Sequence, residues 1–214
     1  MSSTEKEISY KSTNTYTTLN TLTDKTQNVW FVCHGIGYLS KYFLNYFKEL
    51  DVLENYIIAP QAPSKYYLGS KYKHVGASWL TKENTVKEIQ NVMRYFDAVL
   101  ENEKLPNQIN LIVLGYSQGV SVATRYVASR QLKCSHLVLM SGSIPKELER
   151  HNFEFLDSKT RFSLVYGTQD EYLNKDVMLN EKKRFYELFK NNAEIIPFEG
   201  KHEVKKEVLK SLIK

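Results

Sequence analysis

The chain has 214 residues, enough for one α/β domain that buries a large core without disulfides or structural metals. Its net charge of +5 at pH 7 comes from scattered basic residues rather than a block of like charges, which argues against a nucleic-acid partner. The first residues lack the apolar core of a secretory signal, and no apolar run approaches the ~20 residues that cross a bilayer, so a soluble, cytoplasmic protein is expected.

Only two cysteines are present, Cys33 and Cys134, and each lies within an apolar segment of strand type. Two unclustered cysteines form neither a disulfide framework nor a zinc-binding pattern. We therefore expect two buried free thiols in a reducing compartment, and no metal site.

The predicted elements begin with one or two exposed edge strands in residues 8–20, which are rich in threonine and tyrosine. Residues 1–27 are expected to hold these strands and an N-terminal extension. Val29–Cys33 is a buried strand that leads directly into His34–Tyr38, a loop with two glycines. Helical spacing follows over Ser40–Leu53, and the hydroxyl of its first residue is a suitable N-cap.

The next predicted strand, Tyr56–Ala59, is ended by two prolines close together in the sequence. Ser64–Leu80 shows no clean period and is interpreted as a long loop, which in a compact domain is usually functional or mobile. Glu83–Glu103 has apolar residues along one stripe and predicts an amphipathic helix that packs against the sheet.

The most informative stretch is Asn110–Arg130, in which an apolar strand, a sharp turn and a helix follow one another. Its centre is the pattern Gly-x-Ser-x-Gly at Gly115–Gly119, with Ser117 at the turn between strand and helix. In this pattern, called the nucleophile elbow, a tight backbone turn holds a serine hydroxyl clear of the sheet. A serine that merely caps the helix is the alternative interpretation.

Strands and helices continue to alternate after the elbow. The further elements expected are strands at Leu137–Met140, Arg161–Tyr166 and Ala193–Phe198, a helix over Asp176–Asn191 and a lysine-rich helix at the end of the chain. Such alternation predicts an α/β fold, with a mostly parallel central sheet and helices on both faces. We expect a single domain over residues 1–214, without a large separate lid domain.

Three residues that could form a catalytic triad follow predicted strands in the order Ser117, Asp170, His202. A serine hydroxyl is a weak nucleophile and needs a base, which in turn needs a third group that fixes its tautomer. In this hypothesis Ser117 carries the acyl group, His202 acts as general base and then general acid, and Asp170 stabilises the imidazolium. The order Ser, Asp, His is that of α/β-hydrolases.

Other residues compete for these roles. His34 lies beside the glycine loop and is expected to brace that loop rather than accept a proton. Glu171 could replace Asp170 if the turn were rotated, and Asp176 is a further candidate. No two histidines have the spacing of metal ligands.

Acyl transfer also needs two fixed N–H donors that stabilise the oxyanion of the tetrahedral intermediate. One usually comes from the residue after the nucleophile, and the other from an early loop between a strand and a helix. The corresponding residues here are Gln118 and Ile36, both of which would act through the backbone.

Six short motifs together resemble the phospholipase/carboxylesterase family, which contains acyl-protein thioesterases and bacterial carboxylesterases. They are His34–Gly37, Ala59–Pro63, Ser78-Trp79, Gly115–Gly119, Gly167–Asp170 and Gly200–His202. The resemblance covers nearly the whole chain from Val29 onward. It implies an α/β-hydrolase fold and a monomeric or dimeric serine esterase that cleaves small or medium esters or thioesters without a metal or organic cofactor.

Two segments depart from this family's pattern. Tyr38 stands where members often have an aspartate, and Leu80-Thr81 replaces the usual aromatic and acidic pair after the Ser-Trp motif. The substrate rim is therefore expected to differ. The candidate substrate-binding residues are the aromatic side chains of the predicted strand-end loops, Tyr38, Trp79, Tyr116 and Tyr172.

Two other functions are compatible with the same sequence. The triad could serve another acyl transfer or the hydrolysis of short peptides, because one fold and one triad support several reactions. The protein could also be a non-catalytic binding protein with a hydrolase fold, although all three triad chemistries are present.

Overall fold

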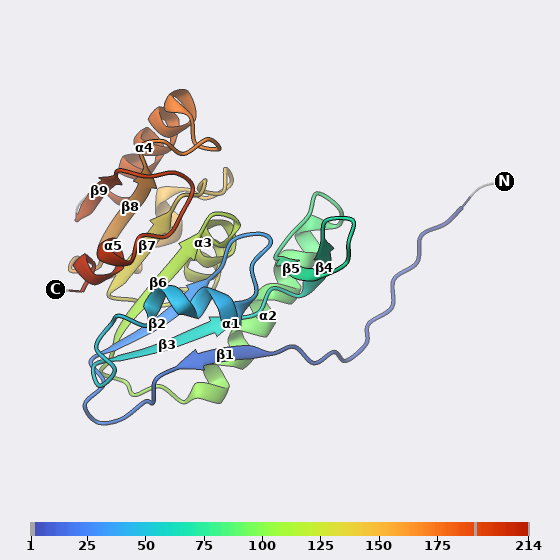
Figure 1. The fold of residues 1–214 in the computed structure, drawn as a ribbon, viewed down its shortest axis with the longest axis horizontal. Coiled ribbons are helices and arrows are strands. Elements are labelled where there is room, and N and C mark those ends of the chain that lie inside the picture. The colour runs from blue at the N-terminus through green and yellow to red at the C-terminus, as the bar shows by residue number, and fades with distance from the viewer. Residues whose placement is uncertain (1–2, 191, 214) are drawn as a thin grey trace.

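The structure is a computed structural model that describes residues 3–190 and 192–213, and its centre is a seven-stranded sheet (Figure 1). In spatial order the strands are β1 (Tyr16–Leu19), β3 (Asn55–Pro60), β2 (Asn28–Cys33), β6 (Asn110–Tyr116), β7 (His136–Met140), β8 (Arg161–Gly167) and β9 (Ala193–Phe198). Only β1 is antiparallel to its neighbour; every other neighbouring pair is parallel. The predicted mostly parallel α/β fold is confirmed.

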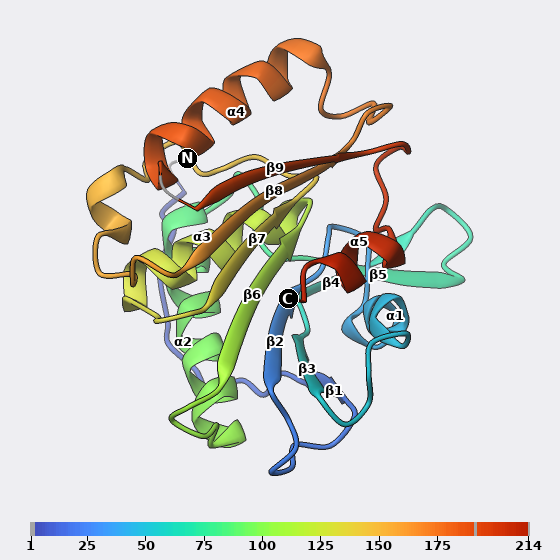
Figure 2. The same cartoon turned by 90° about the vertical axis from the view of Figure 1, so that its left-hand side faces the viewer.

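Helices cover both faces of this sheet (Figure 2). One face packs against α2 (Thr85–Glu103), α3 (Gln118–Arg130) and α4 (Lys175–Phe189), and the other against α1 (Ser40–Phe43), the 3₁₀ helix η1 (Leu44–Phe47) and α5 (Lys206–Ser211). Neighbouring residues of a strand point to opposite faces. Thus, on β2, Phe31 packs edge-on against Phe96 of α2, whereas Trp30 packs against Phe47 of η1.

Most predicted elements agree with the structure to within two residues at either end. The strand Ala193–Phe198 has the predicted bounds, and both cysteines are buried free thiols, as expected. The helix predicted over Asp176–Asn191 is α4, although residue 191 lies outside the described residues. Between β7 and β8 there is only a short 3₁₀ helix, η2 (Arg150–Phe153), which the sequence did not predict.

The helix predicted over Ser40–Leu53 is wrong in its extent. Helical structure ends with η1, because the chain must turn back into β3. Asp51 stabilises this turn, since its carboxylate accepts hydrogen bonds from the N–H groups of Leu53 and Glu54 at 2.8 and 3.1 Å. Ser40 is the first helical residue rather than the N-cap, a position that Leu39 occupies.

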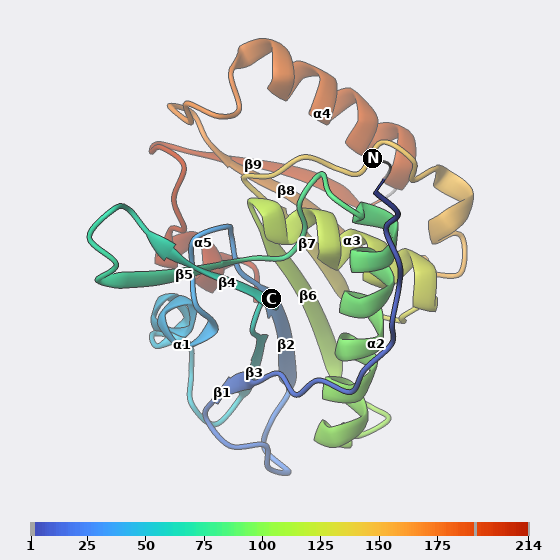
Figure 3. The ribbon, with the colours of Figure 1, turned by 90° about the vertical axis from the view of Figure 1, so that its right-hand side faces the viewer.

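The expected loop Ser64–Leu80 is instead a β-hairpin, β4 (Ser64–Leu68) and β5 (His74–Ser78), which stands apart from the main sheet (Figure 3). All of β4 is exposed, so the segment lacks the alternation of buried and exposed residues that predicts a strand.

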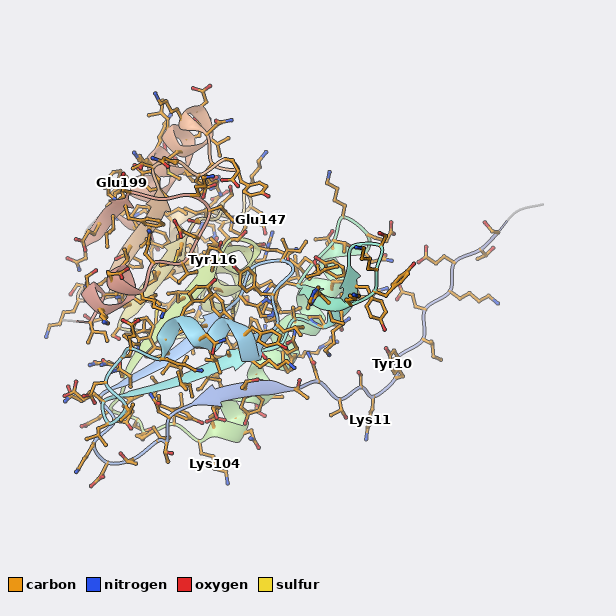
Figure 4. The ribbon with its side chains drawn as sticks, viewed as in Figure 1. Tyr10, Lys11, Lys104, Tyr116, Glu147 and Glu199 are labelled. Atoms are coloured by element: carbon orange, nitrogen blue, oxygen red, sulfur yellow. The ribbon has the colours of Figure 1, made fainter. Side chains whose placement is uncertain are left out.

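The N-terminal region contains one edge strand, within the predicted one or two. Of residues 8–20, only Tyr16–Leu19 forms a strand, and the residues before it are extended without a partner in the sheet. Tyr10 and Lys11 point into solvent from this segment, whereas Tyr116 lies inside the body of the molecule (Figure 4).

Candidate active site

The residues singled out in the sequence meet at one edge of the sheet. The carboxyl ends of parallel strands lie at a common edge, and ligands usually bind just beyond that edge. Ser117 follows β6, Asp170 follows β8 and His202 follows β9, while Ile36 lies in the loop after β2. The topology therefore brings together four segments that are far apart in the sequence.

Ser117 has the backbone conformation of a strained turn, with φ 53° and ψ −119°. A positive φ is uncommon for a residue with a side chain, and it turns the chain sharply from β6 into α3. The Ser117 N–H donates to the Met140 carbonyl of β7 at 2.8 Å, which fixes the turn. Gly119 permits the close approach of α3 to β2, because a Cβ there would lie 2.0 Å from the Cys33 carbonyl oxygen.

Ser117, His202 and Asp170 form a continuous hydrogen-bonded chain. The Nε2 atom of His202 lies 2.9 Å from Ser117 Oγ, and its Nδ1 atom lies 2.8 Å from Asp170 Oδ2. The Asp170 side chain is fully buried, whereas 16 % of the His202 side chain is exposed. Ser117 and His202 accordingly line the cleft, whereas Asp170 lies behind them.

The second carboxylate oxygen of Asp170 also accepts hydrogen bonds. Its Oδ1 atom accepts hydrogen bonds from the backbone N–H groups of Tyr172 and Leu173, at 2.9 and 3.1 Å. Such bonds fix the orientation of the carboxylate toward the imidazole. The competing acids, Glu171 and Asp176, are both exposed, and neither is hydrogen-bonded to His202.

The two expected oxyanion donors lie beside Ser117 on the wall of the same cleft. Gln118 is the first residue of α3, where backbone N–H groups have no partner within the helix. In the other loop, the Gly37 N–H donates to Ala77 O at 2.8 Å and the Tyr38 N–H donates to Gly35 O at 3.3 Å. The first of these bonds, together with one from the Ala77 N–H to Tyr38 O at 3.1 Å, ties the loop around Ile36 to the β4–β5 hairpin, whereas the second closes the loop on itself.

The side chain of Gln118 adds an interaction that the sequence did not reveal. Its amide nitrogen donates to Ser78 Oγ at 3.0 Å and to the Leu80 carbonyl at 2.7 Å, and its amide oxygen accepts from the Trp79 N–H at 2.8 Å. The elbow is thereby fastened to the segment after β5. A polar residue directly after the candidate nucleophile is the only sequence signal of this bridge.

Trp79, expected to bind substrate, has no exposed surface and does not line the cleft. Its indole nitrogen donates to the His34 carbonyl at 2.7 Å, and its ring packs against Phe96 of α2. The structure therefore corrects this assignment: Trp79 supports the His34–Tyr38 loop from behind. The apolar surroundings of Trp79 explain why it lies in the core rather than at the rim, because burial of a large aromatic ring contributes most to stability when it is complete.

His34 braces the same loop, as expected. Its Nδ1 atom lies 2.8 Å from the Gly35 carbonyl, and its Nε2 atom accepts from the Ala62 N–H at 3.1 Å. These bonds require a neutral imidazole with its proton on Nδ1. Burial lowers the pKa of His34 to about 4, because it disfavours the charged imidazolium.

This lowered pKa gives a prediction for stability against pH. Between pH 6.5 and pH 4 the unfolded chain protonates His34 while the folded protein does not, so the free energy of unfolding falls as the pH falls. The loss from this residue is expected to reach about 3 kcal/mol at pH 4. Urea unfolding at pH 7 and pH 4.5 should show a larger decrease for the wild type than for His34→Gln. The control, His151→Gln, changes an exposed imidazole; equal pH slopes in wild type and His34→Gln would contradict the prediction.

The remaining predicted aromatic residues line the cleft. Tyr116 is almost fully buried, and its hydroxyl donates to the His202 carbonyl at 2.9 Å. Burial raises the pKa of Tyr116, which keeps this hydroxyl protonated. Tyr172 is 70 % exposed, with its ring edge-on to that of His202 at 4.8 Å between centroids. Tyr38 packs edge-on against Tyr116 at the rim.

The cleft around Ser117 has a volume of about 1120 Å³ and is open to solvent along one side. Besides the residues described above, it is bordered by α4 and by the segment after β7, which includes Ser141, Gly142, Ile144 and Pro145.

Within residues 3–190 and 192–213 no cluster of three or more histidine, cysteine or acidic side chains is arranged to hold a metal ion. No helix in the same ranges is both long and apolar enough to cross a bilayer.

Comparison with known proteins gives a consistent result. The Phospholipase/Carboxylesterase family model matches residues 14–214. The acyl-protein thioesterase 2 of Zea mays has a similar structure, with a TM-score of 0.69, 15 % sequence identity and coverage of 93 % of this chain and 96 % of that one. The same holds for esterase PE8, with a TM-score of 0.65, 17 % identity and coverage of 92 % and 94 %.

A phospholipase/carboxylesterase from Dyadobacter fermentans is similar as well, with a TM-score of 0.62, 16 % identity and coverage of 95 % of this chain and 96 % of that one. At these identities the structural likeness shows the fold. No curated protein sequence matches the chain. The family model, however, covers nearly the whole length, which confirms the resemblance seen in the sequence. The chain belongs to the phospholipase/carboxylesterase family of α/β-hydrolases.

Proposed function

We propose that this protein is a serine hydrolase that cleaves carboxylic esters or thioesters through an acyl-enzyme intermediate on Ser117. The observation that carries the proposal is the hydrogen-bonded chain from Ser117 through His202 to Asp170, beside a cleft that Ile36 and Gln118 also line. Membership of an esterase family supports the same reaction class.

In the first half of the reaction, His202 Nε2 accepts the proton of the Ser117 hydroxyl while Oγ attacks the carbonyl carbon of the substrate. The negative charge that develops on the carbonyl oxygen is stabilised by the N–H groups of Ile36 and Gln118. His202 then gives its proton to the departing alcohol or thiol. Asp170 stabilises the imidazolium throughout and holds the proton on Nδ1.

In the second half, His202 removes a proton from water, and the hydroxide attacks the acyl carbon bound to Ser117. The tetrahedral intermediate uses the same two donors, and the proton returns to Oγ as the carboxylic acid leaves. No other reactant is needed, because water supplies both the hydroxyl of the acid and the proton of the leaving group.

The proposed setting is the cytoplasm, with one domain over residues 1–214 acting as a monomer or homodimer. Two observations support the cytoplasmic setting and the single domain. Cys33 and Cys134 are both buried and unpaired, which is typical of reducing compartments. The helices of the described residues all pack on one central sheet.

Labelling with a fluorophosphonate, followed by peptide mapping, tests the nucleophile directly. Modification of Ser117 is expected, together with hydrolysis of at least one substrate in a panel of p-nitrophenyl esters, acyl-CoA thioesters and aminoacyl amides. Ser117→Ala should abolish labelling and lower kcat by roughly 10³-fold or more. Activity on amides alone would favour peptide hydrolysis, and equal activity of wild type and Ser117→Ala on every substrate would refute the triad.

A further inference from the structure

The cleft continues beyond Ser117 along the helix α4. This helix connects the end of β8 at the site to the start of β9 at the opposite edge of the sheet, so its later residues lie progressively farther from the triad. Its cleft-lining residues are Val177, Asn180, Glu181, Lys183, Arg184 and Glu187. From Val177 to Arg184 the helix advances about 10 Å, at about 1.5 Å per residue.

The chemistry of the cleft wall changes along this path. On the α4 side the lining next to the triad is apolar, with Leu173 and Val177, whereas the segment after β7 contributes Ser141, Gly142 and Ser143 before Ile144 and Pro145. From Asn180 onward every α4 residue in the lining is polar or charged. The apolar part of this helix wall is therefore about one helical turn long, or roughly 5 Å.

Two charged side chains in the polar part of the α4 wall are held by hydrogen bonds to the segment after β7. Glu181 Oε2 accepts from the Ile144 N–H at 3.0 Å, and Arg184 donates to the carbonyls of Pro145 and Leu148 at 2.6 and 2.9 Å. If either charged side chain turned away, these backbone groups would lose their partners. The polarity of this wall is therefore built into the structure.

A residue of α3 contacts the same segment after β7. Arg125 Nε lies 2.6 Å from a carboxylate oxygen of Glu147, whose position is labelled in Figure 4. The segment from Ser141 to Glu149 replaces the helix that usually connects parallel strands, and it is clamped from both neighbouring helices. These contacts fix the segment relative to α3 and α4.

We propose that the part of the substrate lying along α4 is short and apolar next to the scissile bond, with roughly four to six carbon atoms, and then carries a polar group. This inference rests on the proposed esterase function and names its substrate class. Each methylene gains from leaving water only while the wall beside it is apolar. A longer alkyl chain would have to cover Asn180 and the charged residues after it, which removes their hydration without replacing it.

The proposal is tested with two substrate series. One contains p-nitrophenyl esters of acyl chains from two to twelve carbons, and the other contains acetate esters of alkyl alcohols of the same lengths. In at least one series kcat/KM is expected to peak at about four to six carbons and to fall at least tenfold by twelve. A terminal hydroxyl or carboxylate on an eight-carbon chain should raise kcat/KM over the methyl-terminated ester of equal length.

Variants on α4 test whether this helix determines the chain-length preference. Asn180→Leu extends the apolar wall and is expected to raise the ratio of kcat/KM for ten-carbon esters to kcat/KM for acetate by about five- to tenfold. Tyr186→Leu is the matched control, since it places a leucine on the same helix outside the cleft lining. It should leave the chain-length profile unchanged.

The outcomes separate this inference from the proposed function. A wild-type optimum at ten to twelve carbons in both series, or an Asn180→Leu profile identical to the wild type in both, would overturn the inference while leaving a working esterase. Absence of hydrolysis in every series, together with no fluorophosphonate label on Ser117, would overturn the proposed function and this inference with it.

Discussion

Asp170→Asn is expected to lower kcat for ester hydrolysis by about 10⁴-fold while the protein remains folded. Asp170 Oδ2 accepts the proton that His202 carries on Nδ1, at 2.8 Å. An asparagine that turns its NH₂ group toward the ring would favour the tautomer with the proton on Nε2, which cannot accept the proton of Ser117. Its carbonyl oxygen could still accept from the N–H groups of Tyr172 and Leu173, so the turn should survive.

The measurement is a full kinetic comparison at pH 7.5, together with the rate of fluorophosphonate labelling, which should fall in parallel. Asp176→Asn is the matched control, because it removes the same charge from an exposed residue in the first turn of α4. Its kcat should remain within about twofold of the wild type. If Asp170→Asn retained wild-type activity, Glu171 or another acid would have to take the role of Asp170.

Gly119→Ala is expected to destabilise the protein by about 3 kcal/mol or more and to impair catalysis in the molecules that still fold. The added Cβ would lie 2.0 Å from the Cys33 carbonyl oxygen and 2.8 Å from that of His34. Both neighbours are backbone atoms, so α3 or the end of β2 would have to shift. That shift would separate the Gln118 N–H from the loop around Ile36. Urea unfolding and kcat measured on the same preparation check both effects.

Gly69→Ala provides the contrast. Gly69 lies in the β4–β5 hairpin with φ 72°, and nothing lies within 4 Å of the position that its Cβ would take. Its replacement should cost only about 1 kcal/mol, the price of a positive φ for an alanine, and leave kcat unchanged. Similar losses of stability in the two variants would show that close packing of α3 against β2 is not the reason for Gly119.

The sequence predicted the arrangement of the candidate triad because a parallel sheet turns chain order into spatial order. Ser117, Asp170 and His202 each follow an apolar run, and runs separated by helices place their carboxyl ends at one edge. The same reasoning placed the Ile36 loop. These predictions depended on buried strands, whose apolar character is local and therefore visible in the sequence.

The features that the sequence missed depend on contacts between distant segments. The β4–β5 hairpin is exposed along β4, so its strands lack an apolar signal, and its end is held by Gly37 and by the side chain of Gln118. Trp79 was assigned to the substrate rim as an aromatic residue of a predicted strand-end loop, but its burial against Phe96 could be seen only in three dimensions. The end of helix η1 likewise depends on the turn at Asp51.

The way in which Asp170 is held has a consequence for how members of such a family could diversify. Its carboxylate is fixed by main-chain N–H groups of Tyr172 and Leu173, which any amino acid except proline would supply. Side chains along α4 can therefore be exchanged by mutation without disturbing Asp170, the proposed acid of the triad. Insertions or deletions between Asp170 and Lys175 would alter the hold on Asp170 and the position of α4 at once. Selection can accordingly reshape the specificity of the cleft by point substitutions while the catalytic geometry is inherited unchanged.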